Sequence, residues 1–261
     1  MRGYNLCFVL TNKCNLRCPH CYQEDKNASL TEAQIGKIIE NLDDCADRID
    51  LEGGEVYCER EKFYSTIKLF RGRFGDHLSL RVNTNGVAFY ENRETILKEA
   101  DLLHSLGVDS LRISAGKFHS AGGADRDKTN LIEKVLEDEK HPLKVKYLNL
   151  SQAIAIGSAE SLPESQQEKR ACMNKPGCLE YPHFFSDVLG NVYTCTWRIT
   201  PPIGNLLTEK LGSAFNRLED IQKKILVGDV RSFAKDDYLK KVLDSRGECM
   251  LCKEVFKNEN K

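Results

Sequence analysis

Residues 5–22 read NLCFVLTNKCNLRCPHCY and combine a strand pattern with a metal-ligand pattern. The first seven are mostly apolar and become β-branched toward Thr11, which predicts a buried strand. The polar segment that follows predicts a loop, and this loop carries Cys14, Cys18 and Cys21. Thiolates suit soft metal centres. Three of them in one short loop can hold three irons of a 4Fe-4S cluster and leave the fourth iron open.

Strand and helix patterns then alternate along the chain. The predicted strands cover 49–51, 78–83, 108–114 and 143–150, with the last extending toward Ile156. The predicted helices begin at Ser29, as the N-cap of a capping box with Glu32, and continue with 59–74, 92–106 and 128–139. Such alternation is typical of parallel βα units. A complete eight-fold barrel needs about 250 residues by itself, so we predict an α/β fold built as an open, partial TIM-like (β/α) barrel.

A second, smaller region is predicted after the polar stretch at 158–171. We place the boundary so that residues 1–165 form the partial barrel and residues 166–261 form a small C-terminal domain. This domain is expected to consist of a β-hairpin and helices.

The hairpin is expected in CLEYPHFFSDVLGNVYTC, which runs from Cys178 to Cys195. Aromatic and β-branched residues surround an Asn/Gly turn there, and such a turn would bring the two cysteines together. A helical segment at 211–227 would then return the chain so that Cys249 and Cys252 complete a set of four.

Composition restricts the classes of function. The net charge of −1 gives no general affinity for nucleic acid, so no nucleic-acid partner is expected. No apolar run approaches the ~20 residues of a membrane span, and the polar N-terminus lacks a signal-peptide pattern. We therefore expect a cytoplasmic protein that does not engage a membrane. Eleven cysteines in such a reducing compartment favour metal or redox chemistry over disulfides.

The loop CNLRCPHC with the Tyr22 that follows resembles the CxxxCxxC loop of the radical S-adenosylmethionine (SAM) superfamily. The resemblance implies that the open iron binds the amino and carboxylate groups of SAM. It also implies that SAM is cleaved to a 5′-deoxyadenosyl radical. A zinc knuckle with incidental cysteines is the competing interpretation of the loop.

Other segments fall in the order that this family shows. Gly53-Gly54-Glu55 resembles the GGE motif, whose backbone groups meet the SAM ammonium, and AIAIGSAE at 153–160 partly resembles an adenine-side pattern. The resemblance implies SAM contacts from Tyr22, Gly53, Gly54, Glu55, Asn83, Asn85, Ser114 and Ile156.

The C-terminal cysteines resemble the twitch domain, a shortened form of the SPASM domain of radical SAM enzymes. The resemblance implies one auxiliary 4Fe-4S cluster, held by Cys178, Cys195, Cys249 and Cys252, with Cys172 as an alternative to Cys178. Four thiolates would close this cluster completely, which suits electron transfer. A structural zinc site with four cysteines uses the same spacing and stays open as an alternative. Two 4Fe-4S clusters and SAM are therefore the expected cofactors.

Two residues are candidates for catalysis. Cys172 is a candidate hydrogen-atom donor to a substrate radical, as in radical SAM epimerases, and a spare loop cysteine is the simpler interpretation. His119 follows the fourth strand and would face the barrel mouth, where it would position or deprotonate substrate near neutral pH. The alternative is a surface histidine.

The expected substrate is a natural product. The first hypothesis is a ribosomally made peptide that is epimerised or crosslinked. The second is a carbohydrate or aminocyclitol that is oxidised or epimerised in antibiotic biosynthesis. A zinc-binding protein without catalytic activity is the hypothesis from another class. An electron donor such as flavodoxin or ferredoxin is the expected protein partner.

Overall fold

A computed structural model of the chain describes residues 1–23, 25–89, 91–149, 156–167, 181–195, 197–226 and 228–259. These residues form a sheet of eight strands in the order β5-β4-β3-β2-β1-β6-β7-β8. The strands are β1 (Tyr4–Thr11), β2 (Ala46–Gly53), β3 (Ser79–Thr84), β4 (Ser110–Ala115), β5 (Lys144–Asn149), β6 (His183–Ser186), β7 (Asn191–Tyr193) and β8 (Gly204–Asn205). The predicted α/β class and partial barrel are confirmed.

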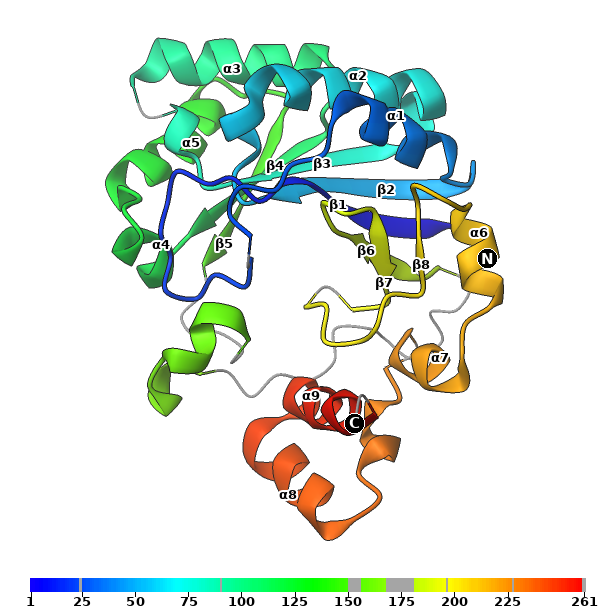
Figure 1. Cartoon of the computed structure of the whole chain (residues 1–261). Coiled ribbons are helices and arrows are strands. Elements are labelled where there is room, and N and C mark those ends of the chain that lie inside the picture. The colour runs from blue at the N-terminus through cyan, green and yellow to red at the C-terminus, as the bar shows by residue number, and fades with distance from the viewer. Residues whose placement is uncertain are drawn as a thin grey trace.

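Helices cover one face of this sheet, and the strands arch around the other (Figure 1). The helices are α1 (Glu32–Glu40), α2 (Arg60–Phe74), α3 (Arg93–Ser105), α4 (Lys117–Ala121), α5 (Arg126–Asp138), α6 (Leu211–Asn216), α7 (Asp220–Leu226), α8 (Asp237–Arg246) and α9 (Glu248–Glu259). The last two lie on the opposite side of the sheet from α1, α2 and α3. No helix in the described ranges is long and apolar enough to cross a bilayer.

The hairpin of β6 and β7 continues the sheet of the barrel. Strands β1 to β5 are all parallel, and β6 adds to the outer edge of β1 in the same direction, with Asn5 opposite His183 and Phe8 opposite Ser186. Strand β7 then pairs antiparallel with β6, as the hairpin pattern predicts. The domain boundary between residues 165 and 166 stays a prediction, and the sheet receives strands from both sides of it.

The two faces of the barrel strands differ in polarity. In β3, Leu80 and Val82 are fully buried toward the helices, whereas Arg81 and Asn83 alternate with them and are partly exposed. Successive strand side chains point to opposite faces, so the inner face is polar along β3, whereas beside β1 and β6 it carries the apolar cluster of Cys7, Val9, Phe185 and Val188. The hydrophobic core lies between the sheet and the helix layer.

Helix α1 begins later than its sequence predicts. The N-cap is Thr31, whose side chain accepts from the amide of Gln34 while Gln34 reaches back to Thr31, so the predicted Ser29 and Glu32 capping box is wrong. The reason is that the preceding residues still run extended beside β1, where the Leu30 amide donates to the Leu10 carbonyl at 3.1 Å. This pairing delays the first helical turn.

Asn41 fastens the end of α1 to the C-terminal part of the chain. Its buried side-chain amide donates to the Leu206 carbonyl at 2.8 Å, and its own backbone carbonyl accepts from the Leu211 amide at 2.9 Å.

We expect Asn41→Ala to lower the free energy of unfolding by about 1–3 kcal/mol, because it leaves the buried Leu206 carbonyl without its donor. Chemical denaturation measures this change. The control is Asn130→Ala on the exposed face of α5, and an equal loss in both variants would contradict the argument.

Candidate functional site

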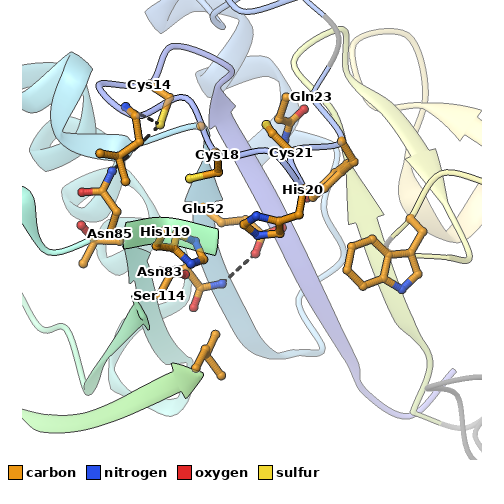
Figure 2. A pocket seen from close by; sticks show the side chains of 17 residues that line it. Cys14, Cys18, His20, Cys21, Gln23, Glu52, Asn83, Asn85, Ser114 and His119 are labelled. Atoms are coloured by element: carbon orange, nitrogen blue, oxygen red, sulfur yellow. Dashed lines mark hydrogen bonds between the residues drawn. The ribbon is translucent and has the colours of Figure 1, made fainter. Parts of the chain in front are cut away.

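A cavity of about 240 Å³ lies where β2, β3, β4 and β5 end (Figure 2). The carboxyl ends of barrel strands are where barrel enzymes place their chemistry. Ten of the residues predicted from sequence are among its lining: Cys14, Cys18, Cys21, Tyr22, Gly53, Gly54, Asn83, Asn85, Ser114 and His119.

The three cysteines of the loop share this cavity wall. The Leu16 amide donates to Cys14 Sγ at 3.4 Å, and Lys26 Nζ donates to Cys21 Sγ at 2.7 Å. Burial, together with the neighbouring thiols of Cys14 and Cys21, raises the pKa of the Cys18 thiol to about 11. An all-thiol donor set with amide and ammonium donors around the sulfurs fits a 4Fe-4S cluster. Loading it requires these thiols to release their protons.

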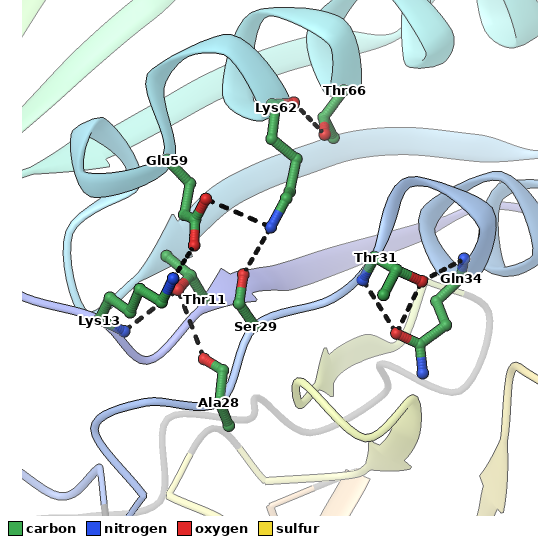
Figure 3. Close-up of polar contacts among 9 residues, drawn as sticks. All are labelled: Thr11, Lys13, Ala28, Ser29, Thr31, Gln34, Glu59, Lys62 and Thr66. Atoms are coloured by element: carbon green, nitrogen blue, oxygen red, sulfur yellow. Dashed lines mark hydrogen bonds and ion pairs between the residues drawn. The ribbon is translucent and has the colours of Figure 1, made fainter.

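Polar contacts hold the loop to helix α2 at its two ends (Figure 3). Near the start, Lys13 pairs with Glu59 at 2.5 Å, and Glu59 also pairs with Lys62 at 3.4 Å. Near the end, Lys62 donates to the Ser29 hydroxyl at 2.9 Å. Lys62 of α2 therefore contacts Ser29 near the end of the loop and also Glu59, which in turn pairs with Lys13 near its start.

The two glycines after β2 let the cysteine loop lie directly against the strand end. A Cβ on Gly53 would stand 2.3 Å from the Thr11 carbonyl oxygen, and one on Gly54 would stand 2.4 Å from the carbonyl oxygens of Asn12 and Lys13. The Gly54 amide donates to the Thr11 carbonyl at 2.7 Å. Glycine is needed here for packing against the loop as well as for access to a ligand.

Glu55 is directed away from the cavity. Its buried carboxylate accepts from the Thr84 hydroxyl at 2.7 Å and from the backbone amide of Asn85 at 2.6 Å. It does not line the cavity. The Glu55 side chain therefore fixes the turn after β3. This turn places Asn85 beside the cysteine loop, where the side-chain amide of Asn85 donates to the side chain of Asn15 at 2.7 Å.

Glu52 is a site residue that sequence reasoning missed. It lines the cavity, accepts from the Asn83 side-chain amide at 2.7 Å, and keeps its other oxygen without a hydrogen-bond partner in the described part of the chain. Burial raises its pKa to about 7. The alternation of Ile49, Asp50, Leu51 and Glu52 in β2 was the available signal, because it places both carboxylates on the inner face.

Tyr22 packs between the cysteine loop and the segment after β7. Its ring meets Trp197 edge-on at 5.4 Å, and the Arg198 guanidinium lies 5.3 Å from the ring centre. Arg198 also donates to the Tyr22 carbonyl and to the side chain of Gln23. Trp197 and Gln23 line the cavity too, so both contribute to the site. Nothing in the sequence pattern marks Gln23.

His119 lies on the short helix α4, directly after β4. Its ring lies 4.8 Å from that of His20, and both rings line the cavity. Burial lowers the pKa of both histidines, that of His20 to about 4, so both imidazoles are neutral near pH 7. Helix α4 reaches the loop because Gly122 has no side chain; a Cβ there would meet Cys18 Sγ at 2.7 Å.

Ile156 lies outside this cavity. It packs in a cluster with Val242, Cys249 and Met250, on the side of the C-terminal helices. The neighbouring Gly157 contacts the cysteine loop, since a Cβ on it would meet the Tyr22 Cα at 2.7 Å. The glycine of the AIAIGSAE segment therefore has a packing role beside the loop.

The C-terminal cysteines are described in part. Cys249 and Cys252 are buried on α9, and Cys195 packs against the cluster that contains Cys252. Cys172 and Cys178 lie outside the described residues. The four-cysteine set therefore stays a prediction.

Comparisons with known proteins support an iron–sulfur site in the cysteine loop. The family described as 4Fe-4S single cluster domain matches residues 2–121. A "Probable GTP 3′,8-cyclase" of Methanocaldococcus jannaschii is 24% identical over 254 residues, which cover 94% of this chain and 78% of the relative. Another, of Methanococcus maripaludis, is 31% identical over 145 residues, 53% of this chain and 48% of the relative. The chain thus aligns with about half the length of that second relative.

Two solved structures share the fold. BtrN in complex with AdoMet and 2-DOIA has a TM-score of 0.57 at 16% identity, covering 88% of this chain and 89% of that one. The structure of anSMEcpe with bound AdoMet and Cp18Cys peptide has a TM-score of 0.54 at 11% identity, covering 94% and 88%. At such identities the likeness concerns the fold.

Gly54→Ala tests the close packing under the cysteine loop. The added Cβ has to displace two backbone carbonyls, so we expect a loss of about 1–3 kcal/mol in the free energy of unfolding together with a lower iron content after reconstitution. Gly36→Ala, on α1, is the matched control, because no atom of the described residues lies within 4 Å of the added Cβ. It should gain about 0.5–1 kcal/mol through helix propensity. Similar behaviour of the two variants would refute the packing role.

Glu52 makes stability depend on pH. Its folded-state pKa of about 7 lies above the ordinary glutamate value of 4.5, so the folded chain binds the extra proton and loses that stabilisation as pH rises through 7. Glu52→Gln should therefore gain about 2–3 kcal/mol relative to wild type between about pH 5 and about pH 8. Chemical denaturation across that range measures it, with the exposed Glu137→Gln as control. A pH-independent difference would show that Glu52 is ionised normally.

Proposed function

We propose that the chain is a radical SAM enzyme and that it removes a hydrogen atom from an unactivated C–H bond of a natural-product substrate. The match of residues 2–121 to the 4Fe-4S single cluster domain and the similarity to relatives named as GTP 3′,8-cyclases support this proposal. The observation that supports this most directly is the shared cavity of Cys14, Cys18 and Cys21 with the ends of the barrel strands. A structural metal site would be enclosed by its ligands, whereas these thiols border a space that polar side chains also line.

Each part of the cavity has a role in this proposal. The three thiols of the loop would hold a 4Fe-4S cluster. When bound there and reduced, such a cluster would supply the single electron that cleaves SAM into methionine and the 5′-deoxyadenosyl radical. Gly53 and Gly54 would offer backbone groups to the SAM ammonium, and Tyr22 would lie at the adenine. Asn83, Asn85 and Ser114 supply polar groups for the rest of SAM.

A ribosomally made peptide is the proposed substrate, to be epimerised or crosslinked. The placement of His119 supports it, because a neutral imidazole in the cavity wall can accept a hydrogen bond from a peptide amide or take a proton. The solved neighbour anSMEcpe was crystallised with a peptide, at an identity that carries only the fold. In an epimerisation, Cys172 is the proposed donor of the returning hydrogen atom.

A small polar molecule is the alternative substrate. The cavity of about 240 Å³ favours hydroxyl or amino groups, as in a carbohydrate or aminocyclitol, because oxygens of Glu52 and Asn83 have no hydrogen-bond partner among the described residues. BtrN was crystallised with 2-DOIA. Because relatives of the chain are named as GTP 3′,8-cyclases, a purine nucleotide is a further candidate among the small polar substrates.

An auxiliary 4Fe-4S cluster is the second part of the proposal. Cys178, Cys195, Cys249 and Cys252 would hold it, and the burial of Cys249 and Cys252 beside Cys195 supports a closed site. Such a cluster would exchange electrons with the substrate radical. Flavodoxin or ferredoxin would supply the electron for SAM cleavage.

Anaerobic reconstitution with iron and sulfide, then dithionite and SAM, tests the function. We expect iron for two clusters in each chain and formation of 5′-deoxyadenosine. Replacing Cys14, Cys18 and Cys21 together with alanine should abolish 5′-deoxyadenosine and leave the iron of one cluster, because the auxiliary ligands remain.

The matched control is Cys58→Ala, which removes an exposed cysteine that does not line the cavity. It should keep both the full iron content and SAM cleavage. Stoichiometric zinc without SAM cleavage in the wild-type protein would overturn the proposal.

A further inference from the structure

The inner face of the barrel carries basic side chains on four neighbouring strands. Asp50 of β2 lies opposite Arg81 of β3, and Arg112 of β4 lies opposite Lys146 of β5. Arg48 lies one inner position before Asp50 on the same strand. These cations therefore occupy adjacent levels inside the barrel, below the strand ends that line the cysteine cavity.

Three guanidinium groups converge on one buried carboxylate. Asp50 is 1% exposed, and its oxygens lie 3.3 Å from Arg48 Nε, 3.8 Å from Arg81 Nε and 3.9 Å from Arg112 Nη1. Among the described residues, these are the ion pairs that the three arginines form. One negative charge therefore faces three positive charges, and Lys146 adds another. Each further positive charge repels the others in this partly desolvated space.

The hydrogen-bond donors of these arginines are also underused. The distances from Arg81 and Arg112 to Asp50 exceed hydrogen-bond length, and Arg48 Nε, although buried, has no hydrogen-bond partner within the described ranges. A guanidinium carries five N–H donors in a fixed planar array that matches the oxygens of phosphate and carboxylate groups. Asp50 thus orients the arginines and leaves most of their donors for another acceptor.

Two of these arginines, Arg81 and Arg112, line a second cavity, of about 730 Å³, at the amino ends of β3, β4 and β5, whereas Arg48 does not line it. Its basic lining on the strands consists of Arg81, Arg112, Lys144 and Lys146, and its acidic lining consists of Asp76 and Asp109, which lie outside the strands. Arg71 also lines it but is committed, because it donates to the carbonyls of Gly107 and Leu78 and pairs with Asp109.

The neighbouring Cys7, Asp50 and His183 have metal-ligand spacing, yet their surroundings disfavour a cation. Cys7 Sγ and His183 Nε2 already lie in hydrogen-bond contact at 3.3 Å. The guanidinium groups around Asp50 would repel a divalent ion placed beside it. The charge of this region selects for an anion.

We propose that Arg81, Arg112 and Lys146 bind an oxyanion group, phosphate or carboxylate, carried by the substrate. That the anion belongs to the substrate rests on the function proposed above, whereas the anion site itself rests on the geometry. Ser114 lines the cysteine cavity, and Arg112 stands two residues earlier on β4, about 7 Å away along the strand. A substrate held here by its acidic group would therefore extend its uncharged part toward the cysteine cavity.

Isothermal titration of the reconstituted full-length protein with inorganic pyrophosphate tests the site. We expect one pyrophosphate per chain. Arg81→Gln and Arg112→Gln should each weaken binding about tenfold or more, the loss that follows from removing hydrogen bonds to a charged group. Lys68→Gln removes an equal charge from the exposed face of α2 and should leave the affinity within about twofold.

Arg112→Lys separates loss of recognition from loss of folding. It retains the charge without the planar array of donors, so its affinity should lie between those of wild type and Arg112→Gln. Circular dichroism verifies that each variant is folded. Citrate in place of pyrophosphate distinguishes the two anion chemistries: tighter pyrophosphate indicates a phosphorylated substrate and tighter citrate a carboxylated one.

Absence of binding at millimolar pyrophosphate, or equal affinity in wild type and both glutamine variants, would overturn the site. The measurement does not depend on SAM cleavage. A protein that binds pyrophosphate but forms no 5′-deoxyadenosine would refute the proposed function and leave the anion site standing. The reverse result would refute the anion site alone.

Discussion

The backbone contact between the end of β2 and the start of the cysteine loop governs the arrangement of the site. The amides of Gly54 and Glu55 donate to the carbonyls of Thr11 and Lys13, both at 2.7 Å, and no side chain fits between the two segments. Because main-chain groups make this contact, it fixes the position of the loop along the barrel axis as well as its direction. The three thiols, the turn held by Glu55 and the strand ends then share one cavity.

Around this contact the barrel divides its inner face by charge. The upper level offers thiols, neutral imidazoles, amides and a carboxyl group whose pKa lies near 7. The lower level offers guanidinium and ammonium groups around Asp50. A polar interior of this kind is possible because the barrel is open and its hydrophobic core lies on the other side of the sheet, under the helices. Along β2, β3, β4 and β5 the inner face is thereby released from packing and available for ligands, whereas Val9 and Phe185 pack together beside β1 and β6.

Sequence reasoning found the parts of this site that follow from chain order. Cys14, Cys18 and Cys21 share one loop, and parallel strands bring Gly53, Asn83 and Ser114 to one edge. It missed what depends on packing between distant segments. The helix α4 was not foreseen, because KFHSA is short and its helical form is set by contact with the cysteine loop. The start of α1 was misplaced because Leu30 pairs with β1. Glu55 carries the expected motif, yet its side chain serves the turn after β3.

The parallel pairing of β6 with β1 also has a consequence for how the chain folds. Strand β1 is made first, but its second neighbour is more than 170 residues away; Cys7 and His183, which meet here, are separated by 176 positions. Until β6 arrives, one edge of β1 presents unpaired amides and carbonyls, the template on which strands of other molecules add. Contacts of such sequence separation form late and slowly. The nascent barrel therefore passes through a stage in which its most hydrophobic strand is open on one side, and that stage is when chaperones would be needed.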